Sequence, residues 1–227
     1  MDPFYTNMQI FLENHSHTNA SDDCLTSPAN LIAACRRKGI DRLVITDHNT
    51  IAGARAAQLL DPELVIVGEE IMTTQGEILA AFVTEHIPPY LSPEKTISLL
   101  KEQGAFISVS HPFDKMRAGG WREDDLLEIL PYLDAIEVYN SRCMLPHYNR
   151  LAQKFAQRHD VAGTVGSDAH AAFEVGRSLM VLDMFEGPDG MRKVIRQAKF
   201  RVKWSPWWVH FVSRYASIKK KLKSWHV

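Results

Sequence analysis

Eight short apolar runs alternate along the chain with longer amphipathic stretches, and this alternation limits the possible folds more than any other feature. The runs predict strands at residues 8–13, 42–46, 64–69, 78–83, 105–110, 135–139, 161–166 and 178–183. The stretches between them predict helices at 29–38, 50–60, 94–103, 144–159 and 188–199. Runs rich in Val and Ile are typical of strands buried on both faces. Their alternation with helices therefore predicts an α/β fold with βαβ units and a parallel sheet.

Two of the expected helices carry clear end signals. Ser27-Pro28 and Ser92-Pro93 each combine a capping serine with a proline at the first helical position. Gly39 and Gly104 follow the last turns and are typical of helix ends. These signals place the two helix starts within a residue or so.

Polar side chains gather at the ends of the expected strands. They are His15 and His17 after the first strand, His48 after the second, Glu70 after the third, His111 after the fifth, Asn140 and Arg142 after the sixth, and Asp168 and His170 after the seventh. In parallel α/β folds the C-terminal strand ends meet at one face, where ligands bind. We therefore expect these side chains to share one cleft.

Several of these residues are metal-ligand types at useful spacings. Two residues apart in an extended chain, His15 and His17 point to the same side, and Asp168 and His170 repeat that spacing. The full set of candidate ligands is His15, His17, Asp22, His48, Glu70, Glu77, His111, Asp168 and His170. One ion uses about four to six ligands, some of them water, so this set indicates two or three divalent ions sharing bridging carboxylates.

The set contains no cysteine, which favours a hydrolytic site for Zn, Mn or Fe, with Mg less expected. Glu70 is the expected bridging carboxylate because it lies at a strand end. Asp23 stays an alternative to Asp22, and Glu69 to Glu70. His86, His147 and His159 are expected at the surface.

Composition narrows the class of protein. A chain of 227 residues is long enough for one barrel-sized domain with a large core. It has no apolar run of about eighteen residues, and its first residues lack the basic and apolar regions of a secretory signal, so we expect a cytoplasmic protein. Cys24, Cys35 and Cys143 form no CxxC pair and are expected to be reduced, non-catalytic thiols.

Charge is distributed very unevenly. Residues 1–190 hold fifteen Lys and Arg with all 27 Asp and Glu, whereas residues 191–227 hold eleven Lys and Arg and no acid. Apolar residues recur at spacings of three and four in the basic part, at Trp208, Phe211, Tyr215, Ile218, Leu222 and Trp225, beside Arg214, Lys219, Lys220, Lys221 and Lys223. This pattern predicts an amphipathic basic helix. We expect it to pack on the acidic body of its own chain or of a second copy. Peripheral membrane, nucleic-acid and partner-protein contacts are the alternatives.

Over residues 9–185 the chain resembles the PHP (polymerase and histidinol phosphatase) domain family. The resemblance rests on HSHT at 15–18, SDD at 21–23, TDH at 46–48, GEE at 68–70, SHPF at 110–113, EVYN at 137–140 and GSDAH at 166–170. It implies a distorted (β/α)7 TIM-like barrel over 1–200, with residues 201–227 as the basic extension. It also implies a centre of up to three ions held by the nine candidate ligands. Asn14, Asn49 and Glu77 depart from residues frequent in the family, and the core set remains.

The expected activity is metal-dependent hydrolysis of a phosphoester, a phosphomonoester or small nucleotide, by a metal-activated hydroxide with no protein nucleophile. Arg117, Arg142, Arg177 and Asn140 are the expected substrate-binding residues, with Lys115 a further candidate, because arginine holds phosphate bidentately. Two alternatives are a 3′-end exonuclease or nucleotide phosphatase that grips nucleic acid with the basic tail, and a non-catalytic binding module.

Overall fold

Nine strands form two sheets in the computed structural model, which describes residues 8–224, with only the backbone for 223 and 224. The larger sheet has the order β5-β4-β3-β2-β1-β8-β9, and β6 pairs with β7 in the smaller one. The strands are β1 (Gln9–Glu13), β2 (Arg42–Ile45), β3 (Val65–Met72), β4 (Glu77–Ala81), β5 (Phe106–Val109), β6 (Ile136–Asn140), β7 (Gly163–Gly166), β8 (Ser178–Asp183) and β9 (Lys199–Val202).

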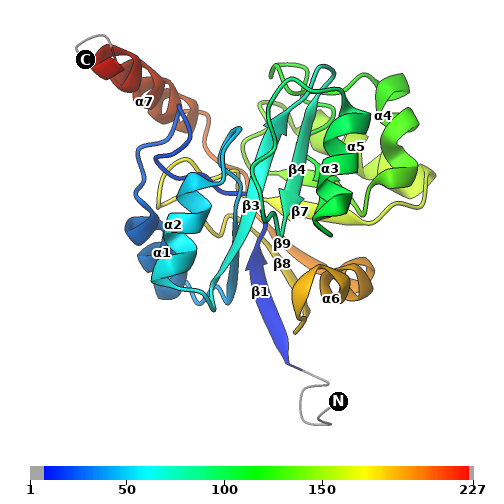
Figure 1. Cartoon of the computed structure of the whole chain (residues 1–227), viewed down its shortest axis with the longest axis horizontal. Coiled ribbons are helices and arrows are strands. Elements are labelled where there is room, and N and C mark those ends of the chain that lie inside the picture. The colour runs from blue at the N-terminus through cyan, green and yellow to red at the C-terminus, as the bar shows by residue number, and fades with distance from the viewer. Residues whose placement is uncertain (1–7, 225–227) are drawn as a thin grey trace.

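Seven α-helices surround these sheets in the described part of the chain (Figure 1). They are α1 (Pro28–Arg37), α2 (Ala52–Leu60), α3 (Pro93–Glu102), α4 (Glu123–Ile129), α5 (Pro146–Arg158), α6 (Gly187–Val194) and α7 (Val209–Ser224). Figure 1 shows α1 and α2 on one side of the strands, α3, α4 and α5 on the other, and α7 projecting from the body. No helix among the described residues is long and apolar enough to cross a membrane.

The alternation of strands and helices is confirmed, whereas the purely parallel sheet is wrong. β1, β2 and β3 are parallel neighbours, and β6 is parallel to β7, but β4 and β8 run antiparallel to their partners. β4 reverses because only a tight turn separates it from β3, closed by a hydrogen bond from Thr73 N to Gly76 O. No α-helix lies between β7 and β8, so β8 returns antiparallel beside β1.

The larger sheet curls into a half-barrel, and the smaller sheet occupies its open side. β6 lies beside β5 and β7 beside β8. The amides of Asp134 and Ala135 both donate to Ile107 O, which ties the start of β6 to β5. The strands therefore form a curled mixed α/β structure, while a closed (β/α)7 barrel remains a prediction.

Local end signals agree with the structure. Ser27 accepts a hydrogen bond from Asn30 N, and Ser92 accepts one from Lys95 N, so both cap their helices. Gly39 and Gly104 have φ of 65° and 71°, a conformation that glycine adopts without strain. The residue after each of these two helices can therefore adopt the positive φ that the helix end requires.

Two elements escaped prediction. α4 begins in the acidic run at Glu123 and is only seven residues long, too short to show a helical period. β9 is an edge strand whose four residues are all exposed, so it lacks the apolar alternation of a half-buried strand. The helix expected at 188–199 is shorter than predicted. α6 ends at Val194, a short 3-10 turn follows, and β9 begins at Lys199.

Candidate metal centre

The predicted cleft residues meet at one rim of the sheet. His15, His48, Glu70, His111 and Asp168 lie at or just beyond the C-terminal ends of β1, β2, β3, β5 and β7. Glu77 joins them from the opposite end of its strand, because β4 is antiparallel to β3 and Glu77 pairs with Met72. The reversed strand thus delivers a carboxylate that a parallel strand would have placed at the far rim.

Glu70 lies at the centre of the cluster. Its Oε1 is 3.4 Å from His15 Nε2 and 3.3 Å from His111 Nε2. Its Oε2 is 3.0 Å from His48 Nδ1 and 3.5 Å from His17 Nε2. A carboxylate with an imidazole pair at each oxygen has the geometry expected for a bridging ligand.

Glu69 serves a different part of the molecule. Successive side chains of a strand point to opposite faces, so Glu69 faces away from Glu70. It accepts hydrogen bonds from the His86 ring at 2.6 Å and from Ile87 N at 3.1 Å. The alternative ligand left open by the sequence is therefore outside the cluster.

Asp168 closes the other side. Its Oδ1 lies 3.3 Å from both His17 Nε2 and His170 Nδ1. Its Oδ2 accepts a hydrogen bond from Asn140 Nδ2 at 3.1 Å and one from Arg117. Asp168 and His111 have positive φ, 52° and 28°, which non-glycine residues rarely adopt. Such strained backbone is a feature of functional sites.

The turn after His17 distinguishes between two neighbouring candidate ligands, Asp22 and Asp23. Asp22 is exposed, whereas its neighbour Asp23 lies 2.9 Å from His170 Nε2 and 3.7 Å from His48 Nε2. Residues 19–23 form turns, in which neighbouring side chains point in different directions. The geometry therefore favours Asp23 over Asp22 as the carboxylate from this loop.

The donor set fits divalent cations. Three overlapping groups bring ligand atoms within 4.8 Å of one another: His17, His48 and His170; His15, His17 and Glu70; and His48, Glu70 and Glu77. Among the described residues, His15 Nε2, His17 Nε2, both Glu70 oxygens and Asp168 Oδ1 are buried without a hydrogen-bond partner. Leaving so many polar atoms unsatisfied is costly, and a shared cation would satisfy them.

Glu137 is a functional residue to which the sequence analysis gave no role. Its Oε1 lies 3.0 Å from His15 Nδ1, and its Oε2 accepts hydrogen bonds from His111 N and Asn140 Nδ2. A carboxylate behind a ligating histidine fixes the ring and raises its basicity. Gly166 leaves the room for this contact, since a Cβ there would lie 2.4 Å from both Glu137 Oε1 and His15 Cβ. The available signal was an acidic residue inside an otherwise apolar strand.

Asp47 supports the opposite wall in the same way. It accepts hydrogen bonds from Thr18 N at 2.6 Å, Thr18 Oγ1 at 2.7 Å and Ser21 Oγ at 2.7 Å. Ser21 Oγ in turn lies 3.2 Å from His17 Nδ1 and accepts from His48 N. One buried carboxylate thus holds the loop and orients two histidines.

The predicted substrate-binding residues separate into different roles. Arg117 reaches the cluster through Asp168, while Asn140 is buried between Glu137 and Asp168, so its amide orients carboxylates. Arg142 is buried, and its guanidinium donates to Val209 O and Ser213 Oγ of α7. Arg177 donates to Trp204 O beside β9. That Asn140, Arg142 and Arg177 contact substrate stays a prediction, and in the structure their side chains form these hydrogen bonds within the protein.

The ligands differ in the protons they hold. Burial, together with His170 and His48, lowers the pKa of His17 to about 3, so this imidazole is neutral and ready to bind a cation. Burial also acts to lower the pKa of His48, but the carboxylates of Glu70, Asp23 and Glu77 outweigh it and raise it to about 10. Burial opposes ionisation of Glu70, yet His15 and His48 hold its pKa well below the usual range.

Comparisons with known proteins give relatives and fold neighbours. A family model described as PHP-associated matches residues 146–200. The uncharacterized protein MJ1587 of Methanocaldococcus jannaschii is 42% identical over 123 residues, 52% of this chain and 69% of that protein. The uncharacterized protein MJ0417 of the same organism is 36% identical over 168 residues, 72% of this chain and 67% of that protein.

Solved structures share the fold at low sequence identity. One, from Bifidobacterium adolescentis and named for metal-dependent phosphoesterase activity, has a TM-score of 0.59 at 18% identity and covers 71% of this chain and 88% of its own. The lesion-specific endonuclease PfuEndoQ of Pyrococcus furiosus has a TM-score of 0.60 at 14% identity and covers 84% and 56%. At these identities the likeness concerns the fold.

Neighbouring carboxylates offer a matched test of the ligand set. We expect Asp23→Ala to lower the affinity for Mn²⁺ or Zn²⁺ by about tenfold or more, because a coordinating oxygen is lost. Asp22→Ala should leave the affinity unchanged, since this side chain is exposed. Titration of the chelator-treated protein, followed by calorimetry, measures both. Equal losses in the two variants would contradict the placement of Asp23.

Metal binding should also release protons. At pH 7 His48 is protonated in the ion-free protein, since its pKa is about 10, and a cation must displace that proton. Apparent affinity should therefore rise with pH up to about pH 10. Calorimetry in buffers of different ionisation enthalpy should give at least one proton released, and His48→Asn should reduce the number by about one. The control His86→Asn, on the far side of β3, should not; no proton release from the unsubstituted protein would refute the assignment.

Proposed function

This chain belongs to the PHP domain family, and from that premise we propose that it is a metal-dependent hydrolase of phosphoesters. The observation that carries the proposal is the group of buried imidazole and carboxylate atoms around Glu70 that lack hydrogen-bond partners within the described residues. We infer that two or three divalent ions are held by His15, His17, Asp23, His48, Glu70, Glu77, His111, Asp168 and His170. The fold likeness to a protein named as a metal-dependent phosphoesterase supports the same class.

Each part of the centre has a role in this proposal. When bound, divalent ions lower the pKa of a coordinated water and neutralise charge that develops at phosphorus. Glu137 and Asp47 hold the histidines in place for them. Arg117 keeps a guanidinium beside Asp168, where it can meet the non-bridging oxygens of a phosphate. The reaction uses no protein nucleophile; Cys143 is buried, and burial raises the pKa of its thiol.

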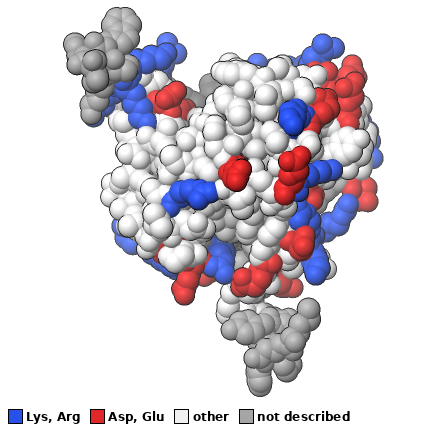
Figure 2. All heavy atoms as spheres, viewed as in Figure 1, with Lys and Arg blue, Asp and Glu red and all other residues white. Residues whose placement is uncertain are grey.

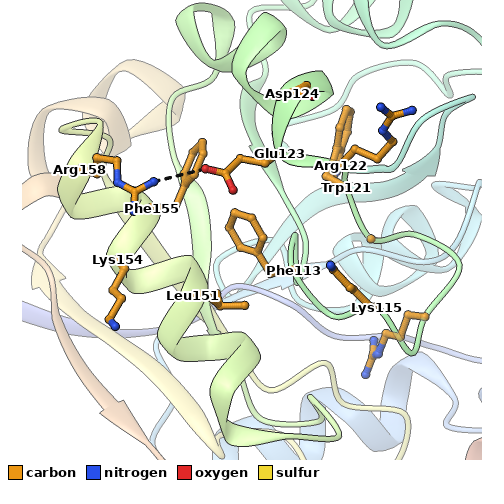
Figure 3. Close-up of a pocket in the computed structure, with 12 residues that line it drawn as sticks. Phe113, Lys115, Trp121, Arg122, Glu123, Asp124, Leu151, Lys154, Phe155 and Arg158 are labelled. Atoms are coloured by element: carbon orange, nitrogen blue, oxygen red, sulfur yellow. Dashed lines mark hydrogen bonds and ion pairs between the residues drawn. The ribbon is translucent and has the colours of Figure 1, made fainter.

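A cavity of about 700 Å³, shown in Figure 3, has Arg117 among its lining residues. Phe113 and Phe155 line its apolar part, and Lys115 and Lys154 approach from the loop after β5 and from α5. The cavity is connected to the centre through Arg117, which lines the cavity and forms an ion pair with Asp168. This placement favours a substrate with an anionic, partly aromatic body beyond the reacting phosphate.

A nucleotide or a short nucleic-acid strand has that chemistry, with phosphates for the lysines and bases for the phenylalanines. Within phosphoester hydrolysis we therefore infer that cleavage of a nucleotide or strand end is the form to test beside simple phosphomonoesters. The fold likeness to a lesion-specific endonuclease is compatible with it.

Phosphate release from an aryl phosphate tests the activity. We expect turnover with Mn²⁺ or Zn²⁺ that chelation abolishes and re-addition restores, and a loss of about a hundredfold or more in kcat for His17→Ala. The control His147→Ala, an exposed histidine on α5, should keep full activity. Activity that survives chelation and His17→Ala would sink the proposal, and tight ligand binding without turnover would favour the non-catalytic module.

The cavity has its own test. Lys154→Ala should lower kcat/KM for a short oligonucleotide by about tenfold and reduce the salt dependence of binding by about one charge, while hydrolysis of the aryl phosphate stays unchanged. Lys95→Ala, an exposed lysine on α3 outside the cavity lining, is the control. If Lys154→Ala affected both substrates equally, the cavity would not be the site for the substrate body.

A further inference from the structure

An exposed row of large apolar side chains, here called the apolar stripe, begins directly before α7 and continues along its outer face: Trp208, Phe211, Tyr215, Ile218 and Leu222. Their exposed fractions range from 44% to 62%. Five large apolar residues side by side in solvent are unusual, since monomeric proteins rarely leave such a patch uncovered. The expected packing of this helix on the body of its own chain is made by its opposite face, and the stripe itself stays exposed. Trp225, expected to extend it, lies outside the described residues.

The opposite face of α7 holds the helix to the body. Val209 and Ala216 are buried there. Arg142 donates to Val209 O at 3.2 Å and to Ser213 Oγ at 2.9 Å, and Lys220 Nζ donates to Asn19 O at 2.6 Å and to Ser21 O. The chain thus uses one face of α7 for attachment and leaves the apolar stripe turned outward.

Positive charge borders the stripe on both sides. With 3.6 residues per turn, Arg214 and Lys221 fall on one flank of it and Lys219 on the other. Lys219 Nζ lies 5.8 Å from the Tyr215 ring. Residues 191–227 themselves contain no Asp or Glu. Figure 2 shows the Lys and Arg side chains gathered along the projecting helix.

We propose that α7 docks this protein on an anionic lipid surface, with the apolar stripe inserted at the headgroup boundary and the flanking cations on the lipid phosphates. An apolar face with aromatic residues and a basic border is the pattern of helices that lie in a membrane interface. Basic residues near such a surface strengthen binding to anionic lipid. The apolar stripe would contact the acyl chains near the headgroups, and the basic side chains would contact the lipid phosphates.

A second copy of the chain or a nucleic-acid strand would suit either the apolar stripe or the flanking basic side chains, but not both. Two copies of α7 packed stripe to stripe would bring their cationic borders together with no acid in the segment to offset them. A nucleic-acid strand would contact the cations but leave Ile218 and Leu222 in water. The lipid surface also suits the attachment of α7 to the loop after His17, because docking then fixes the metal centre close to the membrane.

Vesicle flotation of the full chain tests the proposal. Binding to vesicles of phosphatidylglycerol should exceed binding to vesicles of phosphatidylcholine by about tenfold or more and weaken as salt is raised. Phe211→Gln with Ile218→Gln should lower binding to the anionic vesicles by about tenfold or more, and so should Arg214→Gln with Lys219→Gln. The matched control is Leu59→Gln with Leu60→Gln, two exposed leucines on α2, which should bind as the unsubstituted chain does.

Thermal melting checks that all variants fold, which their exposed positions lead us to expect. Absence of binding, equal binding to both lipids, or binding unaffected by the stripe substitutions would overturn the proposal. Sedimentation without lipid gives a further outcome: a dimer that Phe211→Gln with Ile218→Gln dissociates would assign the stripe to a second copy. Binding of single-stranded DNA that depends on Arg214 and Lys219 but not on Phe211 and Ile218 would assign the cations to nucleic acid. Either result would replace the lipid surface.

Discussion

A buried carboxylate between two pairs of imidazoles is the interaction on which the rest of this structure depends. Glu70 has no exposed side-chain surface, and each of its oxygens faces two histidine nitrogens at 3.0–3.5 Å. Burying such a charge without full hydrogen bonding is unfavourable. The arrangement therefore suits the binding of cations, and the surrounding residues fix the ligand side chains in position.

A second layer of buried carboxylates fixes the ligand side chains. Glu137 fixes His15 and the backbone of His111, and Asp47 fixes the loop that carries His17. The strained φ of His111 and Asp168 is maintained by these contacts and by the strands on either side. Metal ligation, when it occurs, then requires little rearrangement, because the ligands are already within reach of one another.

Hydrogen bonds of two basic side chains link the centre to α7. Arg142 follows the sixth strand and was an attractive phosphate ligand in the sequence, but its guanidinium is committed to Val209, Ser213 and Glu174. Lys220 returns from α7 to the loop after His17. The side chains of Arg142 and Lys220 therefore connect α7 to both sides of the centre. The apolar stripe of α7 takes no part in these contacts.

The sequence by itself determined most of the helices and strands and most of the residues of the candidate centre. All eight predicted strands are present, the two serine-proline caps are where they were expected, and His15, His17, His48, Glu70, Glu77, His111, Asp168 and His170 do converge. These follow from local periodicity, capping chemistry and the position of polar residues at strand ends. The direction of β4 and β8, the choice of Asp23 over Asp22, the supporting role of Glu137 and the use of Arg142 within the protein were decided only by the tertiary structure. Each depends on which groups lie opposite one another across the fold, and residue spacing along the chain does not contain that information.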